Sequence, residues 1–253
     1  MPRVRRPDRR CVAMSPQAKH PGAGHRARLR DKFLEHGLVK FTDDEVLELL
    51  LTLATPRRDC KQQARGLLAA FGSLQAVLDA EPGDLAQIKG IGPKNVLGLK
   101  LVPAVARRYL KDRLLHGGAY EDAAQAAEYL ELTMRPLTKE VFRVMFLDAQ
   151  RQVRGVEDLN SGTLTEHVVY PREVVAKALA GGAASIVCAH NHPSGSTKPS
   201  RADRDFTRRL YHACAGVGVE LLDHVIVGAG ALYSFAASGE LAAFAQEHSN
   251  LNL

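Results

Sequence analysis

The chain has 253 residues, of which 45% are hydrophobic and 25% charged. These proportions are typical of a globular protein and exclude a chain that is disordered throughout. Single domains cluster near roughly 100–150 residues, so the length favours two domains. The net charge of +6 is unevenly distributed, because residues 1–30 carry nine basic side chains against Asp8 alone. This basic arm suits contacts with a phosphate backbone, or it serves only to keep the protein in solution.

The four cysteines, Cys11, Cys60, Cys188 and Cys214, lie far apart and form no C-x-x-C pair. This spacing indicates neither a zinc knuckle nor a disulfide framework. The first thirty residues lack the apolar core of a signal peptide, and no later stretch reaches the apolar length of a membrane span. We therefore expect a cytoplasmic protein with no membrane partner.

The first half of the chain predicts a flexible tail followed by a helical domain. Residues 1–24 are basic, contain four prolines and show no apolar periodicity, as expected of a flexible tail. Residues 25–115 have a helical pattern, in which Thr42 suits the N-cap of a leucine-rich helix with acids in its first turn. A second helix is expected over residues 61–70 and a third, shorter one after Ser73.

The segment from Gln87 to Lys94 has the pattern of a helix-hairpin-helix. Its glycines, Gly90 and Gly92, permit a tight turn that exposes backbone N–H groups at the next helix start, and Lys89 and Lys94 add charge. These four residues, together with the basic N-terminal arm, would bind DNA through its backbone, without sequence specificity and with a strong dependence on salt. The alternative is a turn that serves only the packing of two helices.

The second half of the chain predicts a layered α/β domain. Residues 116–127, with a glycine pair near their start, are expected to be a linker, and residues 128–253 form the domain. Its strands and helices alternate, which indicates a mixed sheet flanked by helices and makes the whole chain α+β. The expected elements are strands at 141–147, 153–156, 183–189 and 219–227, and helices at 171–179 and 200–215.

Three residues of this domain have the spacing of metal ligands. His190 and His192 are two apart at the end of an apolar strand, so their imidazoles project from one face, and Asp203 lies in the first turn of the next helix. Two imidazoles and a carboxylate suit Zn²⁺ and leave the fourth position for water, as in catalytic sites. Alternatively, Ser200 and Asp203 form only a helix cap, and the histidines have solvent or carbonyl partners.

The string His190-x-His192, seven residues, Ser200, two residues, Asp203 matches the JAMM/MPN+ metallohydrolase motif at every position. Within that superfamily the chain resembles the bacterial RadC-like (UPF0758) proteins over residues 25–240. This resemblance implies an MPN fold of the JAB/cytidine-deaminase-like type and one zinc ion per chain. The closer likeness rests on His190 to Gly195, Ser161-Gly162-Thr163, Pro171-Arg172-Glu173 and Leu221-Leu222-Asp223-His224.

The resemblance also implies roles for single residues. His190, His192 and Asp203 would bind zinc, and Ser200 would hydrogen-bond the developing oxyanion or the attacking water. The general base of the family is a glutamate at the start of an earlier strand, which matches Glu140.

Four further polar residues of the second half have two interpretations each. Glu157 is the alternative general base, or a hairpin residue on the solvent face. Asp223 and His224 could orient a zinc ligand or form a buried structural pair. Arg172 could pair with Glu173 or contact substrate. Glu140 itself could merely cap the entry to its strand.

Two functions follow from these features. The first is a zinc-dependent metallohydrolase that cleaves a peptide or isopeptide bond in a peptide or protein substrate, with Glu140 activating the water. The second is a DNA-associated repair or accessory protein, in which the helix-hairpin-helix binds DNA and the zinc domain is a scaffold. The complete ligand set with an available glutamate favours the enzyme.

Overall fold

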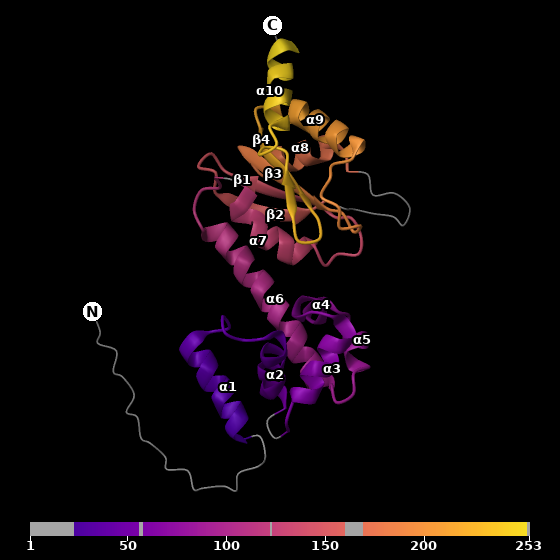
Figure 1. Ribbon diagram of the computed structural model, residues 1–253. Helices are drawn as coiled ribbons and strands as arrows, with labels where there is room; N and C mark the ends of the chain where they lie inside the picture. Colours follow the sequence, from indigo (N-terminus) through magenta and orange to yellow (C-terminus); the bar gives the residue numbers. More distant parts are fainter. Residues whose placement is uncertain (1–22, 56–57, 122, 160–168, 252–253) are drawn as a thin grey trace, which may run out of the picture. The chain divides into compact units, whose positions relative to one another are not determined.

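The computed structural model describes residues 23–55, 58–121, 123–159 and 169–251 (Figure 1). The chain divides into two compact units, one ending at Lys100 and the other beginning at Leu101. Each unit has its own apolar core. Of the predicted flexible tail, residues 1–22 lie outside the described residues, whereas Ala23 and Gly24 already belong to the first helix.

The first unit is helical, as the sequence predicts. Thr42 begins its second helix, where the Thr42 N–H donates to the Glu45 carboxylate at 3.1 Å, and Ser73 caps the fourth by accepting from the Ala76 N–H at 3.1 Å. The core is mainly leucine, including Leu47 from the second helix. The helices are α1 (Ala23–His36), α2 (Asp43–Ala54), α3 (Lys61–Phe71), α4 (Leu74–Asp79), α5 (Pro82–Ala86) and the start of α6 (Pro93–His116).

The second unit is built on a mixed sheet with the strand order β2-β1-β3-β4-β5. Strand β1 is antiparallel to β2 and β3, β3 is parallel to β4, and β5 is antiparallel to β4. This arrangement confirms the predicted fold class. The strands are β1 (Phe142–Leu147), β2 (Val153–Asp158), β3 (Ser185–Asn191), β4 (Glu220–Val227) and β5 (Leu232–Ser234).

Helices cover both faces of this sheet (Figure 1). Three helices, α8 (Pro171–Ala180), α9 (Arg201–Gly216) and α10 (Glu240–Leu251), pack on the face that carries Ile186 and Cys188 of β3. Helix α7 (Ala123–Met134) packs on the opposite face, against alternate residues of β1, β3 and β4. Because successive strand residues point to opposite faces, the central strands are mostly apolar on both sides, with Arg143 in β1 and Asp223 and His224 in β4 among the buried polar exceptions.

The predicted linker at residues 116–127 differs from the structure. Helix α6 runs to His116, and α7 begins at Ala123, inside the expected linker. The intervening Tyr120 is buried, and its N–H donates to the Arg151 carbonyl at 2.7 Å. The segment thus belongs to the second unit, and the division between units lies within α6. This helix of 24 residues, like the others in the described ranges, does not combine the length and apolarity needed to cross a membrane.

Three cysteines lie in the described ranges, and all are buried free thiols: Cys60, Cys188 and Cys214. Burial raises the pKa of Cys214 to about 12, so this thiol stays protonated at neutral pH. The three thiols pack as small apolar groups in the two cores that contain them.

Replacing Leu130 in α7 tests the packing of that helix on the sheet. Leu130 is fully buried, so Leu130→Ala should lower the free energy of unfolding by about 3 kcal/mol through lost burial and the cavity left behind. Leu179→Ala makes the same change at a half-exposed position of α8 and should cost less than about 0.5 kcal/mol. Urea denaturation measures both variants, and equal losses would contradict this packing.

Candidate metal centre

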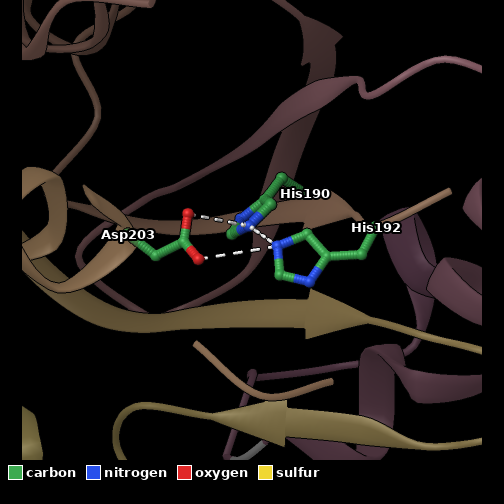
Figure 2. Close-up of side chains that lie close together, drawn as sticks. All are labelled: His190, His192 and Asp203. Atoms are coloured by element: carbon green, nitrogen blue, oxygen red, sulfur yellow. Dashed lines mark hydrogen bonds and ion pairs between the residues drawn. The ribbon is translucent and has the colours of Figure 1, made fainter. Parts of the chain in front are cut away.

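The three predicted ligands lie together at one end of the sheet (Figure 2). His190 Nε2 and His192 Nε2 are 2.9 Å apart. Asp203 places Oδ1 at 3.4 Å from His190 Nε2 and Oδ2 at 3.5 Å from His192 Nε2. One ligand atom of each residue can therefore contact a single ion.

The sheet determines how the two histidines are placed. His190 lies in β3, paired with Phe142 of β1 on one side and Ile226 of β4 on the other. His192 follows the strand end, but its N–H still donates to the Val227 carbonyl at 3.0 Å. Both residues thus stay in register with the sheet and project from the same face, as the spacing of two predicts.

Asp203 is oriented by the cap of α9. Its N–H donates to Ser200 Oγ at 3.1 Å, and the Ser200 N–H donates to Asp203 Oδ2 at 2.7 Å. The helix-cap interpretation is therefore correct, and the same cap turns the Asp203 carboxylate toward the histidines. Burial alone would raise the pKa of Asp203, but contacts with His190 and Ser200 outweigh it and hold the pKa well below its ordinary value. The carboxylate is consequently ionised at neutral pH.

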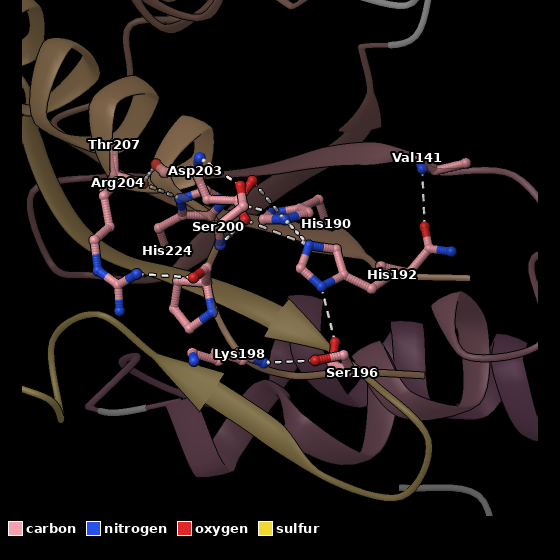
Figure 3. Close-up of polar contacts among 12 residues, drawn as sticks. Val141, His190, His192, Ser196, Lys198, Ser200, Asp203, Arg204, Thr207 and His224 are labelled. Atoms are coloured by element: carbon pink, nitrogen blue, oxygen red, sulfur yellow. Dashed lines mark hydrogen bonds and ion pairs between the residues drawn. The ribbon is translucent and has the colours of Figure 1, made fainter. Parts of the chain in front are cut away.

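A buried chain of hydrogen bonds determines which nitrogen of His190 carries its proton (Figure 3). Thr207 Oγ1 lies 2.6 Å from the Asp203 carbonyl, which can only accept, so the hydroxyl donates to it. The hydroxyl then accepts from His224 Nδ1–H at 2.6 Å, and His224 Nε2 accepts from His190 Nδ1–H at 2.8 Å. His190 Nε2 faces the other ligands, and in a neutral ring it offers them a lone pair.

His224 is neutral in this chain. It is fully buried, and burial together with the neighbouring His190 lowers the pKa of His224 well below its ordinary value. A neutral imidazole has one N–H donor and one acceptor, as the two hydrogen bonds require. Of the two interpretations of His224, this geometry favours the one in which it orients a ligand.

The ring of His192 is oriented by a different partner. Its Nδ1 lies 2.8 Å from the Ser196 carbonyl, which accepts, so Nδ1 carries a hydrogen and Nε2 faces the other ligands. The loop that carries Ser196 packs against the β4–β5 turn, where the Ala229 N–H donates to the Gly195 carbonyl at 2.9 Å. A Cβ at Gly228 would lie 2.5 Å from the side chain of Thr197, so this close approach requires glycine.

Asp223 has a structural role, unlike its neighbour His224. Its two carboxylate oxygens accept from Ser234 Oγ at 2.6 Å and from the Ala236 N–H at 2.9 Å. Burial raises the pKa of Asp223 even though these hydrogen bonds oppose the shift. Because adjacent strand residues point to opposite faces, the two residues separate. Asp223 ties β4 to the segment after β5, whereas His224 contacts a ligand.

The two candidate glutamates occupy different places. Glu140 is exposed and directly precedes Val141. The Val141 N–H donates at 2.8 Å to Oδ1 of Asn191, which lies between the two histidines in the sequence. Glu157 lies in the β1–β2 hairpin, and its carboxylate accepts from Lys177 Nζ at 2.5 Å. The ion pair accounts for Glu157 as a hairpin residue.

The remaining predicted residue of this unit, Arg172, takes a contact that the sequence did not suggest. Its guanidinium lies 4.4 Å from the centre of the Tyr170 ring, at the start of α8. The carboxylate of Glu173 accepts from the Tyr170 N–H at 3.4 Å. The segment Ser161-Gly162-Thr163 lies outside the described residues.

The residues predicted to contact DNA lie in the helical unit, at the turn between α5 and α6. Gly90 has a φ of 86°, so the turn itself favours glycine, and the side chain of Gln63 packs over it, 2.9 Å from the position of a Cβ. The Gly92 N–H donates to Asn95 Oδ1 at 3.2 Å within the start of α6. The other predicted contacts, Lys89 and Lys94, are exposed beside this turn.

The sequence interpretation missed three residues that hold the site: Asn191, Ser196 and Thr207. Thr207 lies one helical turn after Asp203, on the same face of α9, and this spacing is a weak signal that the sequence does contain. The contact of Thr207 with His224 crosses from a helix to a strand 17 residues away. Such a contact depends on the packing of α9 on the sheet.

Two family models match the chain. Residues 120–240 match the RadC-like JAB domain, and residues 24–97 match the UPF0758 N-terminal domain. A UPF0758 protein of Janthinobacterium sp. (strain Marseille) is 40% identical over 85% of this chain and 96% of its own length. A UPF0758 protein of Ectopseudomonas mendocina (strain ymp) is 43% identical over 84% of this chain and 95% of its own length. These matches confirm the resemblance stated from the motifs.

Breaking the buried chain at Thr207 tests whether it orients His190. Thr207→Val keeps the shape and removes the hydroxyl, so the affinity for zinc should fall about tenfold to a hundredfold. Thr52→Val is the matched control, because the Thr52 hydroxyl also donates to a backbone carbonyl within a helix, in the other unit. Competition with a chelator measures both affinities. Equal affinity of Thr207→Val and the native chain would contradict the role.

Proposed function

The chain belongs to the UPF0758 family of RadC-like proteins, and from its candidate metal centre we propose that it is a zinc-dependent metallohydrolase. The observation that carries the proposal is the convergence of two imidazole nitrogens and an ionised carboxylate at His190, His192 and Asp203. Nitrogens 2.9 Å apart share either a proton or a metal ion, and a metal ion that binds both neutral rings takes the place of the proton. The donor set therefore fits a metal ion.

The chemistry of the donors selects among metals. Two neutral imidazoles with one carboxylate suit Zn²⁺, and three protein ligands leave one position open, as in catalytic zinc sites. When bound, the zinc ion would polarise the scissile carbonyl and lower the pKa of a coordinated water. One ion per chain is expected, since the described residues contain one such cluster of histidine, cysteine or carboxylate side chains.

The protein groups around this position would move protons and bind the developing charge. Glu140 would accept the proton of the attacking water and deliver it to the leaving amine, acting first as general base and then as general acid. Ser200 Oγ accepts from the Asp203 N–H, so its own hydrogen remains available. The Ser200 hydroxyl would donate that hydrogen to the developing oxyanion. The substrate would be the peptide or isopeptide bond of a peptide or protein.

A second function, DNA binding by the helical unit, is favoured by the exposure of Lys89 and Lys94 around the glycine turn. Both lysines can reach a phosphate backbone without burying unpaired charge. The engaged Gly92 N–H removes one of the backbone donors that such a turn offers, so the lysines would carry most of the contact. This binding would accompany the hydrolase activity and does not require the zinc site.

Replacing the proposed general base separates metal binding from catalysis. Glu140→Gln should retain zinc and lower the cleavage of a peptide library at least about a hundredfold, because the amide cannot accept the proton. Glu157→Gln should retain both zinc and cleavage, since that carboxylate is paired with Lys177. Mass spectrometry of the cleaved peptides measures activity. If the two variants behaved alike, the assignment of Glu140 would fail.

The proposed DNA contact is tested by removing both hairpin lysines. The double variant Lys89→Ala with Lys94→Ala should bind duplex DNA more weakly, and the slope of log affinity against log salt should decrease by about 2. The double variant Lys40→Ala with Lys61→Ala makes the same change of charge at exposed positions of the same unit. Fluorescence anisotropy over a salt series measures the slopes. An equal decrease in both double variants would exclude a specific role for the hairpin.

A further inference from the structure

Asn191, the residue between the two histidines, holds the segment that carries Glu140. Its side chain is 1% exposed and uses both ends of its amide. Asn191 Oδ1 accepts from the Val141 N–H at 2.8 Å (Figure 3). Its Nδ2 donates to the Lys139 carbonyl at 3.0 Å and to the Leu137 carbonyl at 3.3 Å. Glu140 lies between two of these three anchored residues.

The held segment connects α7 to β1. Helix α7 ends at Met134 and β1 begins at Phe142, so the backbone between them belongs to no helix or strand and needs other hydrogen-bond partners. The three groups that contact Asn191 come from residues 137, 139 and 141, on both sides of a bend at residues 138–139. One amide side chain therefore holds both sides of this bend.

The position of Asn191 links this segment to the metal centre through covalent geometry. Strand alternation turns Asn191 to the face of the sheet that carries Val187 and Ala189, opposite to His190. The segment at residues 137–141 therefore contacts one face of the backbone at residues 190–192, and His190 and His192 project from the other face. A shift of Asn191 would move His190 and His192 with it, so the spacing between the Glu140 segment and the ligands is conserved during such movement.

We propose that Asn191 is a positioning residue that holds Glu140 at the metal centre, an inference that rests on the hydrolase proposed above. The role requires an amide of this length. Aspartate would keep the acceptor but place a carboxylate oxygen against two carbonyls, and leucine would remove all three hydrogen bonds. Asparagine supplies an acceptor oxygen and two N–H donors in the shortest side chain that carries an amide.

Hydrogen exchange of the metal-free full-length chain tests whether Asn191 holds the segment. In Asn191→Leu the Val141 amide should exchange about tenfold faster, because its acceptor is gone. Asn250→Leu is the control at an exposed position of α10 and should leave residues 137–141 unchanged. Unchanged exchange at Val141 in Asn191→Leu would overturn the proposal, whether or not the protein binds a metal.

The cobalt-loaded protein tests whether Asn191 acts on the metal centre through Glu140. The pH midpoint of its visible absorption should shift in Glu140→Gln, and Asn191→Leu, which adds no charge beside the ligands, should shift it in the same direction. Glu140→Gln combined with Asn191→Leu should add nothing further, because both changes act on one carboxylate. Asn191→Ala replaces Asn191→Leu in this series if the leucine variant fails to fold.

Any other outcome of these two experiments would contradict either the positioning role or the proposed hydrolase. Additive shifts, or a midpoint that Asn191→Leu leaves unchanged, would overturn the positioning role while leaving the hydrolase in place. A native chain that binds no cobalt or zinc would contradict the hydrolase and the positioning of a general base with it. In that case faster exchange at Val141 would still identify Asn191 as a purely structural support, which distinguishes the two failures.

Discussion

The convergence of two imidazole nitrogens and a carboxylate is the constraint on which the candidate metal centre depends. His190 Nε2 and His192 Nε2 lie 2.9 Å apart, and each Nδ1 faces a separate partner on the far side of its ring. These partners fix the orientation of both rings, so that Nε2 of each ring faces Asp203. A cation bound by both neutral rings would offset the repulsion between their lone pairs.

Strand β3 connects the candidate ligands to the segment that carries Glu140, because its last two residues project from opposite faces of the sheet. His190 projects toward the helices α8, α9 and α10, where His224 and Thr207 fix its tautomer. Asn191 projects toward α7 and holds the segment of Glu140. The cap of α9 adds Asp203 from a helix that begins beside the strand end. A local change in β3 would therefore disturb the ligands and the proposed general base at the same time.

The sequence predicted most of the fold and the clustering of His190, His192 and Asp203, because those features are local. Apolar runs and glycine stops gave the strands and helices, and the spacing of His190, His192 and Asp203 gave the cluster. The hydrogen bonds between Ser200 and Asp203 cap the helix and also orient the Asp203 carboxylate. The helix-cap interpretation is therefore compatible with the proposed role of Asp203 as a metal ligand. The support of the site was not predictable, since Thr207 meets His224 only when α9 packs on β4. The predicted linker ended too late because the burial of Tyr120 and Ala126 is a tertiary feature.

X-ray absorption at the zinc edge of the purified protein, prepared without metal-affinity steps, tests the central claim most directly. The account predicts one zinc ion per chain with a first shell of nitrogen and oxygen at about 2.0–2.1 Å, the multiple scattering of two imidazoles, and loss of the ion in His192→Ala. Absence of zinc after exposure to it, or a sulfur ligand at about 2.3 Å, would contradict the account.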